Sequence, residues 1–228
     1  MDGLTYSLHQ PNFIPWLGYF NKIARSDIFI YLDNVQYVKN TIANRNKLRD
    51  KNSDILITVP ITRKVNGRSF FPYREAVIAD KIWYRKLFKL LQYNYKTTTY
   101  YKKYISVLES IFTLDDFCHM NIQFIEFVLK EFDISTKTYI MSVLGDDFGK
   151  KTDMLINLGK VINGNVYLSG QGARKYNDEG LFRQNNIRLI YQEYKHPVYK
   201  QVYEPFIPFL SVLDLLLNCG PDGRKYII

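Results

Sequence analysis

Cysteine and histidine are scarce in this 228-residue chain, which limits the chemistry that it can carry. The two cysteines, Cys118 and Cys219, are too few for a disulfide framework or a cysteine-rich zinc site, and they indicate a reducing environment. No apolar run approaches the roughly 18 residues that a membrane-spanning helix needs. The first residues show neither the basic region nor the apolar stretch of a signal peptide. We therefore expect a cytoplasmic protein with no transmembrane segment.

The chain also lacks internal repeats, low-complexity tracts and Pro/Ser-rich linkers, so we predict a single domain over residues 1–228. Hydrophobic residues make up 46% of it, which excludes disorder for most of the chain. Lys and Arg outnumber Asp and Glu by 31 to 22, a formal net charge of +9. That excess fits phosphorylated substrates, nucleic acid, an anionic membrane or simply a basic solvated surface, and it does not choose among them.

Alternating strand and helix patterns predict an α/β fold. A strand over 4–8, a helix over 16–25 and a buried strand over 28–32 form a βαβ unit with a parallel pair. A strand over 55–61 and a turn at 65–68 predict a hairpin whose second arm is 69–73. The other predicted elements are helices near 80–93, 100–113 and 117–132, a strand over 137–143, a helix over 153–162, a strand over 166–168, a short helix from residue 173, a strand over 187–191 and a helix over 210–218.

This order predicts a parallel-sheet, Rossmann-like core with a helical subregion at about 80–132 inserted in it. In such sheets ligands bind outside the carboxyl ends of the strands, so the residues that follow strands are the candidates for function.

The first candidate group follows the first predicted strand. His9, Gln10 and Asn12 stand at the junction of strand and helix, where a histidine can donate to a phosphate or act as a general acid or base. Gly18 and Tyr19 lie in the first helical turn, and a ligand could approach the backbone closely at Gly18. The alternative is a capped turn in which the histidine bonds to backbone.

The second group follows the next strand. Asp33 stands where doubly wound folds often place an acidic residue for a ribose hydroxyl or a metal, and Gln36 comes shortly after it. Asn44, Arg45 and Asn46 combine a planar guanidinium with flanking amides, which suits a phosphate or carboxylate. An Asx turn with a surface arginine is the alternative. We predict no metal ligands, because Asp33 alone is too little for a metal site.

The third group opens a predicted helix late in the chain. Ser169, Gly170 and Gly172 form a turn whose backbone N–H groups could bind an anion, and Arg174 adds charge ahead of Tyr176. We favour phosphate contact here over an ordinary loop.

Three further features bear on function. His196 follows a predicted strand and is a second candidate base. Asp214 lies among leucines, so we expect it to be buried and paired, because an unpaired buried carboxylate is costly. Residues 93–104 interleave Tyr with Lys, a pattern that can bind RNA but that we interpret as two amphipathic helix ends.

Long motifs along nearly the whole chain resemble the WbqC-like family. They are His9-Gln10-Pro11-Asn12-Phe13-Ile14-Pro15-Trp16-Leu17-Gly18-Tyr19-Phe20, Leu32-Asp33-Asn34-Val35-Gln36-Tyr37, Asn44-Arg45-Asn46, Thr152-Asp153-Met154-Leu155-Ile156, Tyr167-Leu168-Ser169-Gly170, the Tyr191 to His196-Pro197 segment, Leu210-Ser211-Val212-Leu213-Asp214 and Asn218-Cys219-Gly220.

The resemblance implies work in O-antigen, lipopolysaccharide or other surface-polysaccharide biosynthesis. It implies a transferase that modifies a nucleotide-activated or lipid-linked amino sugar, by transfer of an acyl or aminoacyl group. We expect a nucleotide sugar or another phosphorylated small molecule as partner, with tRNA less favoured, and no cofactor can be named. The alternatives are an aminoacyl-tRNA-dependent transferase, a nucleotidyltransferase-like enzyme, and a non-catalytic binding or scaffold protein of the polysaccharide machinery.

A more distant similarity is to nucleotidyltransferases of the HIGH-motif superfamily. Trp16-Leu17-Gly18-Tyr19 occupies the position of their His-x-Gly-His turn, with both histidines replaced. We predict that nucleotide phosphates rest on the Ser169–Arg174 turn and that Arg45, with its flanking asparagines, holds a second polar group. His9 or His196 is then the general base, and Asp33 orients it.

Overall fold

Five parallel strands form the central sheet of the computed structural model, which describes residues 3–228. In spatial order the strands are β5 (Lys137–Ile140), β2 (Ile28–Tyr31), β1 (Thr5–His9), β6 (Val166–Ser169) and β7 (Arg188–Tyr191). The predicted α/β class and the predicted parallel pair of the first βαβ unit are confirmed. In that pair β1 runs beside β2 from Tyr6 opposite Ile28 to His9 opposite Tyr31.

The direction in which the sheet grows reverses between β1 and β6. From β1 the chain adds β2 and then β5 on one side, and it then returns to add β6 and β7 on the other side. In open α/β sheets, a crevice forms outside the carboxyl ends of the strands at such a reversal, and ligands bind there. His9 and Ser169 are the last residues of the two strands that flank it.

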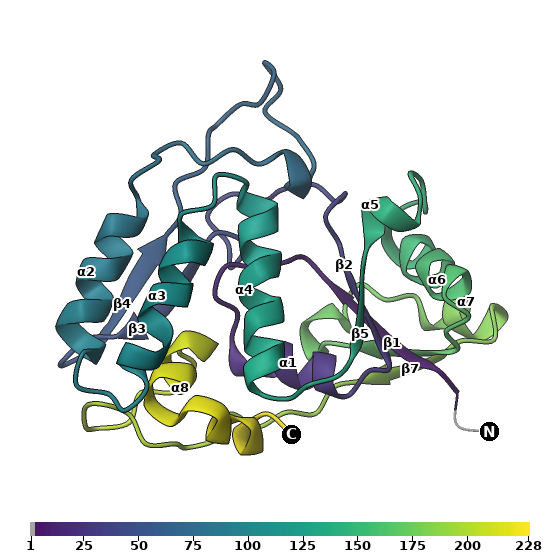
Figure 1. Cartoon of the computed structure of the whole chain (residues 1–228). Helices are drawn as coiled ribbons and strands as arrows, with labels where there is room; N and C mark the ends of the chain where they lie inside the picture. The colour runs from purple at the N-terminus through teal and green to yellow at the C-terminus, as the bar shows by residue number, and fades with distance from the viewer. Residues whose placement is uncertain (1–2) are drawn as a thin grey trace.

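Helices cover both faces of the sheet. Tyr6, Leu8, Ile28 and Ile30 pack on one face, in a cluster that includes residues of α6 (Lys151–Val161) and α7 (Glu179–Gln184). Alternate strand residues point the other way, toward α1 (Leu17–Ala24) and α4 (Phe117–Glu131). Figure 1 shows α6 and α7 on one side of the sheet and α4 on the other.

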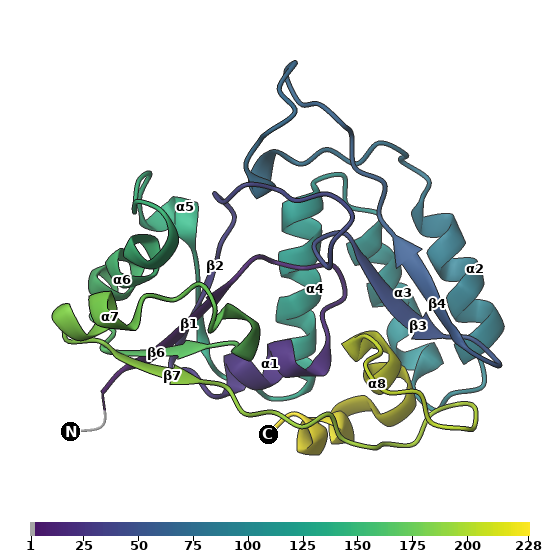
Figure 2. The same cartoon turned by 180° about the vertical axis from the view of Figure 1, so that it is seen from behind.

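A second layer lies beyond α4, as Figure 2 shows. It contains α2 (Tyr84–Tyr95), α3 (Tyr101–Phe112), α8 (Val212–Cys219) and the antiparallel hairpin of β3 (Arg45–Arg49) and β4 (Asp54–Thr58). The short elements are η1 (Tyr73–Glu75), α5 (Met141–Leu144), η2 (Gln171–Ala173) and η3 (Gly220–Tyr226). The three helices predicted over 80–132 are confirmed as α2, α3 and α4. None of the helices in residues 3–228 has the length and apolar character needed to cross a membrane.

The predicted pairing of the strand at 55–61 with residues 69–73 was wrong. The turn at 65–68 is present, since the backbone N–H groups of Val65 and Arg68 each donate to the carbonyl of the other. However, β4 pairs with β3 and not with residues 69–73. The sequence of β3, Arg-Asn-Lys-Leu-Arg, carries only one apolar residue, so the apolar alternation that marks a strand is missing from it.

Two predicted element boundaries also need correction. The strand predicted over 137–143 ends at Ile140 and passes directly into α5, whose Ser142 N–H donates to the Asp33 carboxylate at 2.9 Å. The helix predicted from Ala173 is absent, because η2 ends at that residue and α7 begins at Glu179. Asp178 caps α7 by accepting from the Leu181 N–H at 3.0 Å.

A buried polar network joins the hairpin to the helical layer. Asp214 on α8 is fully buried, as expected, and its carboxylate accepts hydrogen bonds from the hydroxyls of Tyr95 at 2.7 Å and Tyr199 at 2.8 Å. The Tyr95 hydroxyl also accepts from the backbone N–H of Arg49 at 2.7 Å. Burial raises the pKa of Asp214, and the hydrogen bonds of Tyr95 and Tyr199 counter that shift.

Removing the Tyr95 hydroxyl should therefore destabilise the fold. In Tyr95→Phe, one carboxylate oxygen of Asp214 and the Arg49 N–H both lose a partner in the interior, at a cost of about 1–3 kcal/mol. Urea unfolding measures the loss. Tyr93→Phe is the matched control, because Tyr93 is on the same helix but 71% exposed, and its midpoint should not move. Equal midpoints for both variants would contradict this account.

Candidate functional site

A cavity of about 570 Å³ opens at the carboxyl ends of β1 and β6, at the reversal point of the sheet. It is within the size range of small-molecule sites. The predicted site residues that the structure brings together in its lining are His9, Gly18, Tyr19, Ser169, Gly170, Gly172 and His196. They come from β1, α1, the turn after β6 and the segment that follows β7.

His9 is held from several sides. Its Nδ1 lies 3.1 Å from the carbonyl oxygen of Gln10 and 3.3 Å from the side-chain nitrogen of Asn12. The rings of Tyr19 and Trp16 meet the imidazole edge-on, with centroids 5.2 Å and 5.6 Å away. Burial, followed by the nearby charge of Lys22, lowers the pKa of His9 to about 3, so the ring is neutral at physiological pH.

Lys22 is a charged residue of the cavity lining that was not among the predicted site residues. It is 5% exposed, and its ammonium donates to the carbonyl oxygen of Leu8 at 2.9 Å. Among residues 3–228 it has no ion-pair partner. Burial lowers the pKa of Lys22 to about 7. A signal was present, because Gly18 and Lys22 are four residues apart and so share one face of α1.

The turn after β6 leaves its backbone open. A Cβ added at Gly170 or Gly172 would meet no atom within 4 Å, so a ligand has room to approach the backbone there. The turn itself is fixed: the buried Ser169 hydroxyl accepts from the Asn177 amide at 2.9 Å. Gln171 donates to the carbonyl of Gln192 at 3.0 Å.

Gln192 closes one wall of the cavity. Its side-chain nitrogen donates to the Gly18 carbonyl at 2.8 Å and to Asn21 Oδ1 at 2.7 Å, which ties the end of β7 to α1. Gly18 must be small here, since an added Cβ would lie 2.9 Å from Trp16 Nε1 and 3.2 Å from Tyr194 Cδ1. Trp16, Tyr194 and Phe209 are aromatic lining residues that sequence reasoning missed.

His196 lines the same cavity with a different environment. Its Nε2 accepts a hydrogen bond from the backbone N–H of Phe209 at 3.1 Å, which engages the lone pair that a general base would use. Phe209 has a positive φ of 61°, so this bond supports a backbone conformation that is rare for a bulky residue. Burial lowers the pKa of His196.

Asp33 lies outside the cavity lining. Its carboxylate accepts from the Ser142 backbone N–H at 2.9 Å and from the Ser142 hydroxyl at 2.5 Å, so it joins the end of β2 to α5. Gln10 and Gln36 are also outside the lining, and the Gln10 amide donates to the Gln36 carbonyl at 3.3 Å. Among residues 3–228, no three His, Cys, Asp or Glu side chains lie close enough to hold a metal ion together.

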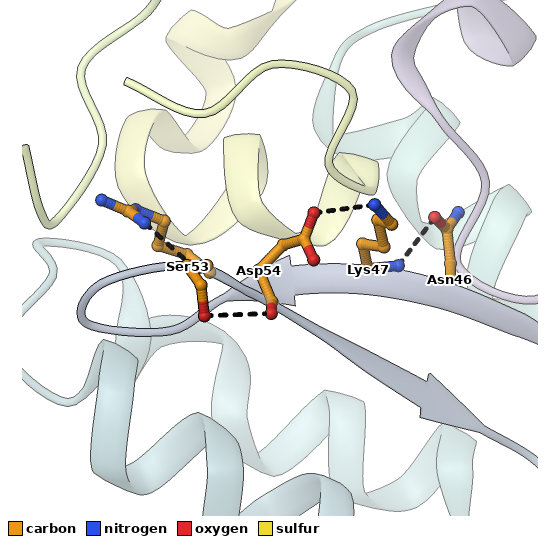
Figure 3. A network of polar contacts seen from close by, with 5 residues as sticks. Asn46, Lys47, Ser53 and Asp54 are labelled. Atoms are coloured by element: carbon orange, nitrogen blue, oxygen red, sulfur yellow. Dashed lines mark hydrogen bonds and ion pairs between the residues drawn. The ribbon is translucent and has the colours of Figure 1, made fainter. Parts of the chain in front are cut away.

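The Asn44–Asn46 group sits on the hairpin, away from the cavity. Asn44 donates to the Val59 carbonyl at 2.8 Å, and Asn46 donates to the Ile14 carbonyl at 2.8 Å. Figure 3 shows the opposite end of the Asn46 amide, whose oxygen accepts from the Lys47 N–H. Both amides therefore bind backbone, and Arg45 between them is half-buried.

Arg174 and Tyr176 point away from the lining as well. The Arg174 guanidinium lies over the Tyr191 ring, 4.5 Å from its centroid, and lines a separate hollow with residues of α7. Tyr176 is 79% exposed. In the Tyr/Lys-rich stretch at 93–104, Tyr95 and Tyr104 are buried in the core and cannot stack on bases.

Comparison with known proteins identifies the family of the chain. The model of the WbqC-like protein family matches residues 10–226. The chain belongs to this family. It is also 32% identical over 224 residues to a protein of Mycobacterium tuberculosis, described as "Uncharacterized protein Rv1507c", and the match covers 96% of this chain and 95% of that protein. No solved structure is significantly similar to the chain. The WbqC-like membership was predicted from the sequence and is confirmed, whereas the roles of the site residues stay predictions.

Lys22→Met should stabilise the protein in a pH-dependent way. Because the pKa of Lys22 falls from 10.5 to about 7 on folding, its unfavourable contribution is full below about pH 7 and disappears as the pH rises toward 10.5. The stability gap between variant and wild type should therefore be widest near pH 6 and narrow steadily toward pH 10.

Urea midpoints across this pH range measure the gap. Lys86→Met, at an exposed position on α2, is the control, and its gap should not change with pH. A constant gap for Lys22→Met would show that the Lys22 ammonium keeps its ordinary proton affinity in the folded state.

Proposed function

We propose that this protein is an enzyme of O-antigen or other surface-polysaccharide biosynthesis that modifies a nucleotide-activated amino sugar by acyl or aminoacyl transfer. The WbqC-like family supports the pathway, through the gene clusters with which such proteins are associated. The observation that carries the proposal is the cavity at the reversal point of the sheet, which gathers His9, Lys22 and the open Ser169–Gly172 turn.

We also propose that the parallel sheet is a nucleotide-binding, Rossmann-like core. The strand order supports this, because the cavity lies at the carboxyl ends of the two strands between which the order reverses. The aromatic rings of Trp16, Tyr194 and Phe209 give the lining apolar surfaces for a base or a sugar ring.

His9 is the proposed general base. When Nδ1 carries the proton, it donates to the Gln10 carbonyl and cannot accept from the Asn12 amide nitrogen. In that tautomer the lone pair of Nε2 is free, and no hydrogen bond within residues 3–228 engages that atom. Nε2 would take a proton from the amine or hydroxyl of the sugar as that atom attacks the acyl carbon. The bond between the acyl carbon and the carrier of the acyl group then breaks, the carrier leaves with the electron pair, and the His9 imidazolium gives it the proton. His196 is less suited to this role because its Nε2 already accepts from Phe209.

A thermal-shift panel tests the substrate class. The ligands are UDP-, dTDP- and GDP-sugars, ATP with Mg²⁺, and bulk tRNA. One nucleotide-sugar class should raise the unfolding temperature, since a ligand at a hundredfold its dissociation constant stabilises by about 2.7 kcal/mol. A response to tRNA alone, or to none of the ligands in a folded sample, would contradict the proposal.

The sugar that binds then serves to test the base. His9→Gln should lower kcat at least about a hundredfold and change KM little, because loss of proton transfer acts on the transition state. His196→Gln is the matched control, and its kcat should stay within a few-fold of wild type. An unchanged kcat in His9→Gln would remove His9 from the mechanism.

A further inference from the structure

The charged side chains of the cavity lining are of one sign, positive. Among residues 3–228, the lining contains Lys22 and two histidines but neither aspartate nor glutamate. The titratable groups that share the lining with Lys22 are His9 on β1, Tyr19 on α1, Tyr167 on β6, and Tyr194 and His196 after β7. Burial raises the pKa of Tyr19, Tyr167 and Tyr194, so none of them supplies a negative charge. The part of the chain that the structure describes therefore gives the cavity a buried cation and no anion.

An ammonium group in this position is incompletely satisfied. Lysine carries three N–H donors, and the Lys22 ammonium has one acceptor among the described residues, the Leu8 carbonyl. The Phe29 ring lies 6.0 Å away and gives weak cation–π attraction. A buried charge is costly unless it is paired and hydrogen-bonded, so this arrangement suits a site whose missing partner arrives with a ligand.

We infer that Lys22 binds a phosphate group of the substrate, in the part of the cavity next to the end of β1. This inference rests on the proposed function, because it names the group of the activated sugar that the cavity holds there. A phosphate oxygen supplies the acceptors and the negative charge that Lys22 lacks, and the bond is charge-assisted.

Phosphate binding at Lys22 would also raise the pKa of His9. The positive charge of Lys22 is the second cause, after burial, of the low pKa of His9. A phosphate beside Lys22 would offset that charge and raise the pKa of His9, which brings the imidazole closer to the range of an effective general base. Lys22 is therefore proposed as a substrate-binding residue that also tunes the base.

A purely structural role for Lys22 makes a different prediction. If the ammonium serves only to bond the Leu8 carbonyl, its removal will change stability but not the affinity for an oxyanion. Sulfate separates the two cases, because it resembles phosphate in shape and its charge does not change near neutral pH. Calorimetric titration of the full-length protein with sulfate gives the dissociation constant directly.

For wild type we expect sulfate binding that weakens about tenfold per pH unit above about pH 7, because the amine must take up a proton to bind the anion. Lys22→Met should raise the dissociation constant at least about tenfold at pH 6 and show no such pH dependence. Lys86→Met removes one positive charge from an exposed position on α2, outside the cavity, and is the matched control. It should stay within about twofold of wild type, since a screened surface charge contributes little.

Equal sulfate affinity in Lys22→Met and wild type would overturn the inference, as would an equal loss in Lys86→Met, which would indicate a general effect of surface charge. Circular dichroism confirms that each variant is folded. The test of this inference can fail independently of the test of the proposed function. Nucleotide-sugar binding with Lys22-independent sulfate affinity would overturn the inference alone, whereas Lys22-dependent sulfate binding without nucleotide-sugar binding would overturn the proposed substrate.

Discussion

The buried connection between β1 and α1 is the constraint on which the rest of the structure depends. Residues 11–15 are all buried, so their backbone polar groups must find partners inside the protein. The Tyr73 hydroxyl donates to the Pro11 carbonyl at 2.5 Å, Asn46 donates to the Ile14 carbonyl, and the Phe13 N–H donates to the Ala43 carbonyl at 3.0 Å. The hairpin, η1 and the segment before β3 thus supply the hydrogen-bond partners of the connection that begins after His9.

This constraint explains why polar residues divide into two sets. The asparagines at 44 and 46 and the carboxylate of Asp33 satisfy backbone groups and hold elements together. His9 and Lys22, on the other side of the same connection, face a cavity and keep unsatisfied hydrogen-bonding capacity. The second set destabilises the fold, since Lys22 is buried and has no carboxylate partner among residues 3–228. Such groups concentrate where ligands bind.

The sequence predicted the sheet better than the site. Strands β2 and β6 carry apolar runs, and β1 alternates Tyr6 and Leu8 with polar residues. The order of these strands placed His9 and Ser169 at the correct edge. The sequence of β3 is polar, because this strand buries little besides Leu48 and Arg49, and no apolar pattern could reveal it. Lys22 was missed because a lysine on a short helix is normally solvated. Its four-residue spacing from Gly18 was the one feature of the sequence that indicated a position on the cavity side of α1. That Lys22 has no carboxylate partner among residues 3–228 is a property of the tertiary structure, which the sequence does not show.

Fluorescence of Trp16 tests the central claim, that the cavity at the ends of β1 and β6 is the substrate site. The chain has two tryptophans, and Trp83→Phe leaves Trp16, which lines the cavity, as the single reporter. Titration with the nucleotide sugar that stabilises the protein should change the Trp16 emission with the same dissociation constant that calorimetry gives. Binding by calorimetry with an unchanged Trp16 emission would place the substrate elsewhere and contradict the account.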